Sequence, residues 1–337
     1  MKIIIDAMGG DNAPREILQG ASEAVREYGV DIIAVGNSEK IAACVKEHAI
    51  DMAHIRVVNA SEEISMHDEP TAAIRNKKDS SMVVALRMLA AGEGDCMVSA
   101  GSTGALLTGA TLIVKRLKGV KRPAIATLVP AIEKPYLLLD SGANAECRPE
   151  MLEAFAVMGS IYAEKVLGRA KPQVALANIG AEETKGTPTY IETHALLRKN
   201  RDIHFVGNIE PKDIPFGKVD VVVCDGFTGN VILKLTEGLA KALMGEIKGV
   251  FTKNLLTKLS FLCVKGGLRT FKKKLDADET GGAPFLGVTK PVIKAHGSSS
   301  AKAFKNAIRQ AKECCENKAI EAMAEALQTR VIDDAEE

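Results

Sequence analysis

A short apolar run that passes directly into a glycine-containing polar turn and then into a helix constrains this chain most. The clearest case is residues 219–230, where VDVVVC is followed by DGFTGN and Val231 begins a helical pattern. This pattern predicts a buried strand followed at once by a helix N-terminus. In parallel α/β sheets such turns often bind ligands, because the free N–H groups of the helix favour anions. The alternative is an ordinary loop with a capped helix.

Related turns recur along the chain, at residues 2–14, 95–107, 136–144, 173–186 and 291–300. About nine or ten strand-like runs alternate with helices, and most are not joined by hairpin signals. This alternation predicts an α/β fold with a mostly parallel, doubly wound sheet. We expect the ligand crevice at the carboxyl ends of the strands. A length of 337 residues suffices for one large α/β unit or for two lobes.

Composition excludes several classes of protein. The net charge is +1, aromatic residues make up 4% and Trp is absent, which argues against nucleic-acid binding. The dinucleotide, Walker A and G-x-S-x-G motifs are missing, and the seven cysteines lack the spacing of zinc ligands, so we expect no cofactor and no metal. The chain opens with a strand and has no apolar run of membrane-spanning length, which predicts an intracellular protein with reduced thiols.

Several polar residues in these turns are candidates for chemistry, each with a plainer alternative. Asp6 could orient a substrate or stabilise its turn. Lys185 lies between glycines after a buried strand, which suits an anion clamp, although a lone lysine is more often a surface charge. His296, beside three serines, is a site residue or a helix cap.

Residues 248–278 form a predicted insertion, a pair of basic amphipathic helices. Lysines and an arginine alternate there with apolar side chains, which are Phe251, Leu255, Leu259, Phe261, Leu262, Leu268 and Phe271. Phe261 falls outside the main apolar stripe, so the surplus apolar surface needs a partner. An anionic membrane surface would bind both the apolar residues and the lysines. A second subunit packed on the pair is the alternative, and both can hold.

Glycine-rich anion sites without an evident protein nucleophile suit a reaction in which phosphate itself attacks. Inorganic phosphate is largely dianionic near neutral pH, so its attack on an acyl carbon needs positioning and stabilisation of the oxyanion more than a strong base. A thiolate leaving group, with a thiol pKa of about 8.5, needs little acid assistance.

Six motifs together resemble the bacterial acyl-ACP:phosphate acyltransferase family. They are residues 6–11 (DAMGGD), 99–105 (SAGSTGA), 140–144 (DSGAN), 178–186 (NIGAEETKG), 224–230 (CDGFTGN) and 296–299 (HGSS). The resemblance implies conversion of fatty acyl-acyl carrier protein and inorganic phosphate to acyl phosphate, the first step toward phosphatidic acid in phospholipid synthesis. It also implies a three-layer α/β/α fold like that of isocitrate and isopropylmalate dehydrogenases, as a single catalytic unit over residues 1–337 with a protruding helical hairpin.

The resemblance further implies a cytoplasmic homodimer that associates peripherally with the membrane, beside the downstream glycerol-phosphate acyltransferase. By the resemblance, Lys185 and Asn230 are the catalytic candidates, and the hairpin residues face the membrane. The implied phosphate and substrate site comprises Asp6, Gly9, Gly10, Ser102, Thr103, Gly104, Asn144, Thr228, Gly229, His296, Ser298 and Ser299.

Two other functions remain open at this point. A nicotinamide-dependent dehydrogenase would need an adenine-ribose site, and the decarboxylating type also an aspartate cluster for a metal; neither is legible in the sequence. A lipid-binding module would explain residues 251–275 and leave the glycine-rich turns without a role. The docking surface for acyl carrier protein is either the basic patch at residues 115–122 or the lysines of the hairpin.

Overall fold

The computed structural model describes residues 1–274 and 281–336, apart from the side chains of residues 255, 272–274 and 329–336. The end of the predicted insertion, residues 275–278, and the side chain of Leu255 therefore lie outside the described parts. No described helix is both long enough and apolar enough to cross a lipid bilayer.

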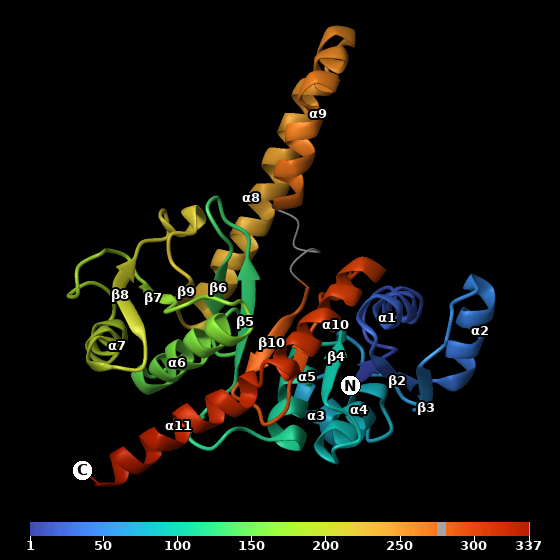
Figure 1. Cartoon of the computed structure of the whole chain (residues 1–337), viewed down its shortest axis with the longest axis horizontal. Coiled ribbons are helices and arrows are strands. Elements are labelled where there is room, and N and C mark those ends of the chain that lie inside the picture. The colour runs from blue at the N-terminus through green and yellow to red at the C-terminus, as the bar shows by residue number, and fades with distance from the viewer. Residues whose placement is uncertain (275–280, 337) are drawn as a thin grey trace.

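A single sheet runs through the molecule in the order β3-β2-β1-β4-β11-β10-β5-β6-β9-β7-β8 (Figure 1). Its strands are β1 (Lys2–Asp6), β2 (Asp31–Gly36), β3 (Ile55–Asn59), β4 (Cys96–Ser99), β5 (Ala124–Val129), β6 (Tyr136–Leu139), β7 (Gln173–Ala177), β8 (His204–Ile209), β9 (Val221–Val223), β10 (Ala283–Leu286) and β11 (Val292–Lys294). The prediction of an α/β fold with a mostly parallel sheet is confirmed.

The exceptions to parallel pairing lie in the middle of the sheet. β10 is antiparallel to both β11 and β5, and β5 is antiparallel to β6. The strands from β3 to β11 therefore run one way, and those from β6 to β8 run the other way. The crevice is predicted at one set of carboxyl ends, whereas the two flanking groups of strands end at opposite edges of the sheet.

Helices cover both faces because successive side chains of the strands point to opposite sides. Ile3 and Ile5 pack with one group of helices, and Ile4 packs with another. The first face carries α1 (Arg15–Tyr28), α2 (Ser38–His48), α6 (Pro149–Lys165), α7 (Pro188–Lys199), α10 (Ala301–Glu316) and α11 (Ala319–Glu336). The opposite face carries α3 (Pro70–Asn76), α4 (Ser81–Ala90), α5 (Thr103–Gly109) with the π-helical turn η1 (Ala110–Val114), the short 3-10 helix η2 (Ile214–Phe216) and the start of α8 (Gly226–Thr252).

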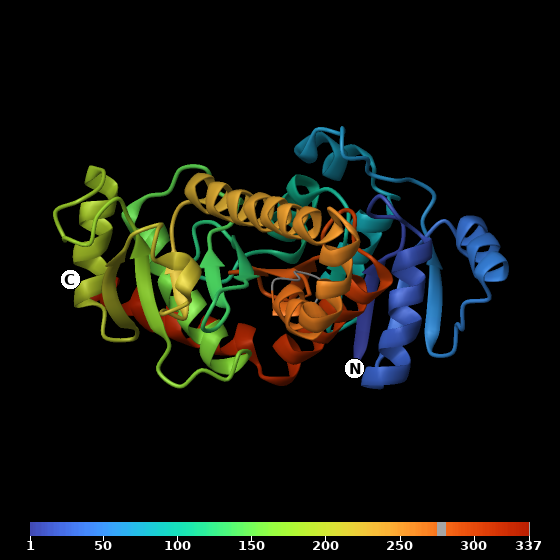
Figure 2. The ribbon, with the colours of Figure 1, turned by 90° about the horizontal axis from the view of Figure 1, so that it is seen from above.

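α8 and α9 (Leu255–Lys274) leave the body of the molecule as a projecting pair (Figure 1). Figure 2 shows this pair over the middle of the molecule, with α8 on the side of the sheet opposite to α11. Near the tip, the rings of Phe251 and Phe261 meet edge to face with centroids 5.6 Å apart. We use the name projecting pair for residues 226–274 from here on.

Candidate active site

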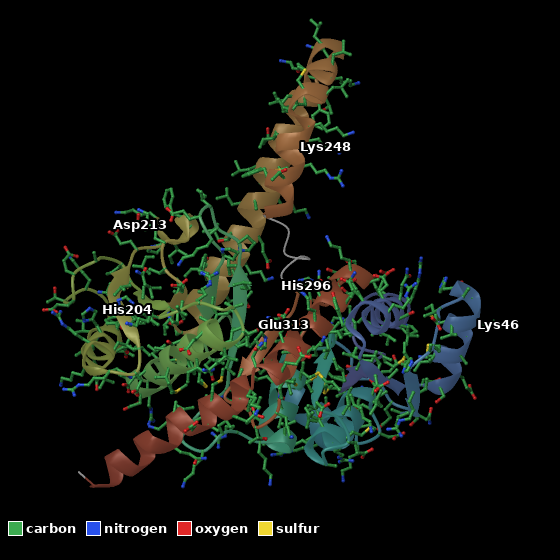
Figure 3. All side chains as sticks on the ribbon, viewed as in Figure 1. Lys46, His204, Asp213, Lys248, His296 and Glu313 are labelled. Atoms are coloured by element: carbon green, nitrogen blue, oxygen red, sulfur yellow. The ribbon has the colours of Figure 1, made fainter. Side chains whose placement is uncertain are left out.

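A cavity of about 560 Å³ lies over the antiparallel centre of the sheet, beside α8. β5, β10 and β11 contribute its floor, and α8 contributes one wall. The polar residues around it are Thr103, Thr127, Ser141, Asn230, Lys234, Thr236, Glu237, Lys294, His296, Ser298 and Ser299. Figure 3 shows His296 between the two halves of the molecule, near the foot of the projecting pair. The cavity thus joins loops from both halves of the sheet.

Asp6, at the end of β1, supports the cavity from behind. Its carboxylate accepts hydrogen bonds from the hydroxyls of Ser81 at 2.6 Å and Ser99 at 2.7 Å. Burial raises the pKa of Asp6, and these hydrogen bonds oppose the rise. Asp6 is 1% exposed and does not line the cavity, so in this structure its carboxylate holds the β4 turn in place.

Gly9 and Gly10 bring the loop after β1 against its neighbours. A Cβ atom on Gly9 would lie 2.7 Å from the backbone nitrogen of Gly101. Gly10 has φ +105°, and a Cβ atom there would lie 2.9 Å from the carbonyl oxygen of Gly297. The backbone N–H of Asp11 donates to the same carbonyl at 2.8 Å. These glycines therefore fix the position of the loop after β11 and do not line the cavity themselves.

In the loop after β4, one of three predicted residues reaches the cavity. Thr103 lines it. The Ser102 hydroxyl instead accepts a hydrogen bond from the Ala105 N–H at 3.5 Å, which caps α5. Gly104 gives space to Pro70, whose Cγ would lie 2.8 Å from an added Cβ atom.

The loop after β6 is organised by a second buried carboxylate, Asp140. It accepts hydrogen bonds from the backbone N–H groups of residues 125 and 142–144 and from the Asn144 side chain. Burial raises the pKa of Asp140, and hydrogen bonds from Ala143 and Ile125 oppose the rise. Asn144 Nδ2 also donates to the Pro123 carbonyl at 2.8 Å. Asn144 therefore holds the loop, and it is not among the residues that line the cavity.

Asn230 reaches the cavity from the first turn of α8. Asp225 caps this helix by accepting from the Thr228 N–H at 2.8 Å, and its carboxylate also accepts from the Thr228 hydroxyl at 3.0 Å. Thr228 is thereby turned away from the cavity. A Cβ atom on Gly229 would lie 1.9 Å from the Asp140 carbonyl oxygen, so only glycine allows α8 to approach this closely.

Lys185 lies apart from the cavity in the loop between β7 and α7. Its side chain is exposed, and it does not line the cavity. Its carbonyl oxygen accepts a hydrogen bond from Asn178 Nδ2 at 3.0 Å, which ties the loop to the end of β7. Because β7 and β9 are parallel neighbours, this loop and the start of α8 emerge at the same edge of the sheet.

His296 presents one ring nitrogen to its own loop. The Ser298 N–H donates to His296 Nδ1 at 3.2 Å, and the Ser298 hydroxyl lies 2.8 Å from the same atom. A backbone N–H can only donate, so Nδ1 accepts, and the neutral ring carries its proton on Nε2. Ser299 is 5% exposed and donates its N–H to the His296 carbonyl at 3.0 Å.

Lys294 is a buried cation of this cavity, and no role is predicted for it from the sequence. It ends β11, lines the cavity and is only 9% exposed. Nζ donates to the Ala100 carbonyl at 3.2 Å and to the Ala295 carbonyl. Burial lowers the pKa of Lys294 to about 8, while the charges of Asp6 and Asp11 act in the opposite direction. The sequence signal that could have revealed it is a lysine closing an otherwise buried strand.

The predicted membrane-facing residues divide into two groups. Leu259, Leu262 and Phe271 are 55%, 65% and 46% exposed. Phe251, Phe261 and Leu268 are half-buried, the first two in their ring contact. Another row of exposed apolar residues, spaced four apart on α8, is not part of the predicted set; it comprises Phe227, Val231, Leu235, Leu239 and Leu243.

The arrangement suits anion binding and acyl chemistry. Asn230 and Lys294 line one cavity with the hydroxyl of Thr103, so amide, ammonium and hydroxyl donors face one space. Such donors stabilise a phosphate or a developing oxyanion. Within the described residues, no cluster of three or more His, Cys, Asp or Glu side chains is arranged to hold a metal ion.

Comparison with known proteins agrees with this chemistry. The family model described as fatty acid synthesis protein matches residues 1–322. The phosphate acyltransferase of Alkaliphilus oremlandii is 48% identical over 336 residues, covering 100% of both chains. That of Acetivibrio thermocellus is 46% identical over 338 residues, covering 100% of this chain and 99% of the relative.

Two solved structures share the fold. A phosphotransacetylase from Streptococcus pyogenes superposes with a TM-score of 0.65 at 19% identity, covering 95% of this chain and 94% of the other. The EutD phosphotransacetylase from Staphylococcus aureus gives a TM-score of 0.62 at 18% identity, covering 93% and 94%. The full-length identities to the relatives, not these distant structures, establish the family: this chain belongs to the phosphate acyltransferases, a family of enzymes.

Proposed function

We propose that this enzyme transfers a fatty acyl group from acyl carrier protein to inorganic phosphate. A phosphate oxygen attacks the thioester carbonyl carbon, a C–O bond forms, the C–S bond breaks, and acyl phosphate and the free thiol of acyl carrier protein leave. The observation that carries this proposal is the shared cavity of Asn230, Lys294 and Thr103 in a phosphate acyltransferase. These donors suit the phosphate and the tetrahedral oxyanion, and the reaction needs no metal or cofactor.

We assign the Asn230 amide to the oxyanion, because it faces the cavity from the wall formed by α8. Thr103, His296, Ser298 and Ser299 surround the phosphate from the opposite side. Lys185 remains the second catalytic candidate, by sequence resemblance and by the common edge of β7 and β9. From its exposed loop it would meet the thioester at the mouth of the cavity, where acyl carrier protein presents it. A dehydrogenase-like classification of the fold stays an inference from the same resemblance.

A thiol-release assay tests the function. Purified protein is mixed with palmitoyl-acyl carrier protein, with and without inorganic phosphate, and free thiol is measured. Thiol release that depends on phosphate supports the proposal. Absence of release in both conditions would favour a lipid-binding module. A nicotinamide-dependent dehydrogenase would instead show a change in nicotinamide absorbance with a hydroxy-acid substrate and no thiol release.

The projecting pair supports two further parts of the proposal, a homodimer and a peripheral place on the cytoplasmic membrane surface. The row from Phe227 to Leu243 forms a ridge of residues four apart, and such ridges pack against a second helix. The exposed leucines near the tip, Leu256, Leu259 and Leu262, suit the membrane. We assign the ridge to a second copy of the chain and the tip to lipid, beside the downstream glycerol-phosphate acyltransferase.

Light scattering tests the dimer directly. Leu235 and Leu239 are 66% and 55% exposed in the single chain, so Leu235→Lys with Leu239→Lys should convert a dimer to a monomer. A wild-type protein that is monomeric at micromolar concentration would refute the assignment of the ridge.

The docking surface for acyl carrier protein is either residues 115–122 or the lysines of the projecting pair. Charge-reversal variants of each surface distinguish the two, because only the variant at the docking surface should change KM for acyl carrier protein.

A further inference from the structure

Lys294 is a buried ammonium group without a carboxylate in contact. Within the described residues, no Asp or Glu oxygen forms an ion pair with Nζ, whose hydrogen-bond acceptors are the carbonyls of Ala100 and Ala295. Two neutral carbonyls leave one of its three N–H bonds available. A charge that is 91% removed from solvent is costly unless it is paired, so this position needs a reason beyond packing.

The carboxylate whose charge acts most strongly on Lys294 already accepts hydrogen bonds from other groups. Asp6 influences Lys294 through its charge, yet its oxygens accept from the hydroxyls of Ser81 and Ser99 and from the Met8 N–H. The carboxylate therefore stays behind the β4 turn while the ammonium lines the open cavity. The part of the chain that the structure describes does not supply the anion that would complete the coordination of Nζ.

We propose that Lys294 binds the phosphate substrate, with its ammonium group donating to a phosphate oxygen in the cavity between β11 and α8. This assignment rests on the proposed function for the identity of the reaction, although phosphate binding is measured without it. The hydroxyl of Thr103 lies at the same cavity, as hydroxyl donors do in phosphate sites. Asn230 comes from the other wall, which leaves its amide for the acyl oxygen. Lys294 is thus a substrate-contacting residue that orients the attacking phosphate.

Other charged groups surround this position. Asp6 and Asp11 act on Lys294 from the β1 side, and His296 follows it in the chain. Lys234 and Glu237 of α8 face the same cavity. Since Lys294 loses its proton as pH rises through about 8, phosphate affinity should fall between pH 8 and pH 10, where the phosphate remains dianionic.

Isothermal titration calorimetry with inorganic phosphate tests the assignment on wild-type protein, Lys294→Met and Lys290→Met. Methionine keeps the length and removes the charge, and Lys290 is an exposed lysine just before the same strand. Lys294→Met should weaken phosphate binding at pH 7 by roughly 10- to 100-fold, the range for a hydrogen bond to a charged group, and Lys290→Met should not. Equal affinity in Lys294→Met and wild type would overturn the proposal.

Two further measurements keep the test decisive. If Lys294→Met does not fold, the wild-type titration at pH 8 and pH 10 replaces it, and pH-independent affinity refutes the assignment. In the thiol-release assay, Lys294→Met should raise KM for phosphate and leave KM for acyl carrier protein unchanged, and Lys294→Arg should restore part of the loss. Phosphate binding through Lys294 without thiol release would refute the proposed function alone, whereas thiol release with an unchanged phosphate KM would refute the role of Lys294 alone.

Discussion

Each half of the sheet carries one lysine to which the proposed function gives a role, and the two lysines differ in surroundings. Lys294 ends a central strand, is 9% exposed and faces the cavity. Lys185 lies on an exposed loop after β7, outside the cavity lining. The glycines around Lys185 make it conspicuous in the sequence, whereas Lys294 is conspicuous only by its burial. A glycine-rich motif therefore indicates a loop, whereas the cost of burying a charge indicates which group needs a ligand.

The two lysines should act at different steps of the reaction, and we expect the largest effect on kcat at Lys185. Lys185→Ala should remove turnover, with a loss of roughly 10³-fold in kcat, and leave phosphate affinity unchanged, because Lys185 is outside the cavity. Its exposure predicts a change below about 0.5 kcal/mol in the free energy of unfolding. Thiol-release kinetics, phosphate calorimetry and urea unfolding measure the three quantities. Wild-type kcat in this variant would remove Lys185 from the mechanism.

The variant Asn230→Ala tests whether the wall formed by α8 stabilises the acyl oxygen. Asn230→Ala deletes one donor to the oxyanion and should lower kcat by roughly 10²-fold, with little change in phosphate affinity. Asn317→Ala is a suitable control, since Asn317 ends α10 and its side chain bonds the Glu313 carbonyl. If Asn230→Ala weakened phosphate binding and spared kcat, Asn230 and Lys294 would have to exchange roles.

The pH dependence of the free energy of unfolding tests the burial of Lys294. The folded-state pKa of Lys294, about 8, lies below its ordinary value of 10.5. Between these values the unfolded chain binds more protons, so the stability of wild type relative to Lys294→Met should rise with pH, by up to about 3 kcal/mol. Urea unfolding of both proteins at pH 7 and pH 10.5 measures the difference. A flat difference for Lys294→Met would contradict its burial as a charged group.

The smallest effect concerns the projecting pair. Leu262→Ser should reduce binding to anionic lipid vesicles roughly tenfold, because a buried leucine contributes about 1.5 to 3 kcal/mol. Ile132→Ser provides a matched control on the body of the molecule, since Leu262 and Ile132 are 65% and 64% exposed. Sedimentation with vesicles measures both variants. An equal loss in the two variants would mean that the tip has no special role at the membrane.

The sequence predicts much of the fold, because each strand-to-helix unit is local. The alternation of β-branched runs and helices suffices for the α/β fold with a mostly parallel sheet. The reversal at β5 and β10 is not legible, because β10 pairs with β5 across a long separation in the chain. Because of that reversal, the cavity lies over the centre of the sheet, between loops that follow strands running in opposite directions.

The residues that line the cavity are also predicted only in part. Thr103, Asn230, His296, Ser298 and Ser299 line the cavity as the motifs indicate. Other motif residues shape the backbone: the Thr228 side chain joins the cap at Asp225, and that of Asn144 bonds Asp140 and Pro123. Whether a polar side chain in a turn faces a ligand or its own loop depends on hydrogen bonds that spacing alone does not specify.

The most direct test of acyl transfer to phosphate uses inorganic phosphate labelled with ¹⁸O in every position. The enzyme is incubated with palmitoyl-acyl carrier protein, and the product is analysed by mass spectrometry. Attack by phosphate predicts palmitoyl phosphate that retains all of the labelled oxygens, one of them bridging carbon and phosphorus. Unlabelled palmitate accompanied by unchanged labelled phosphate would show that water attacks the thioester, and would contradict the account.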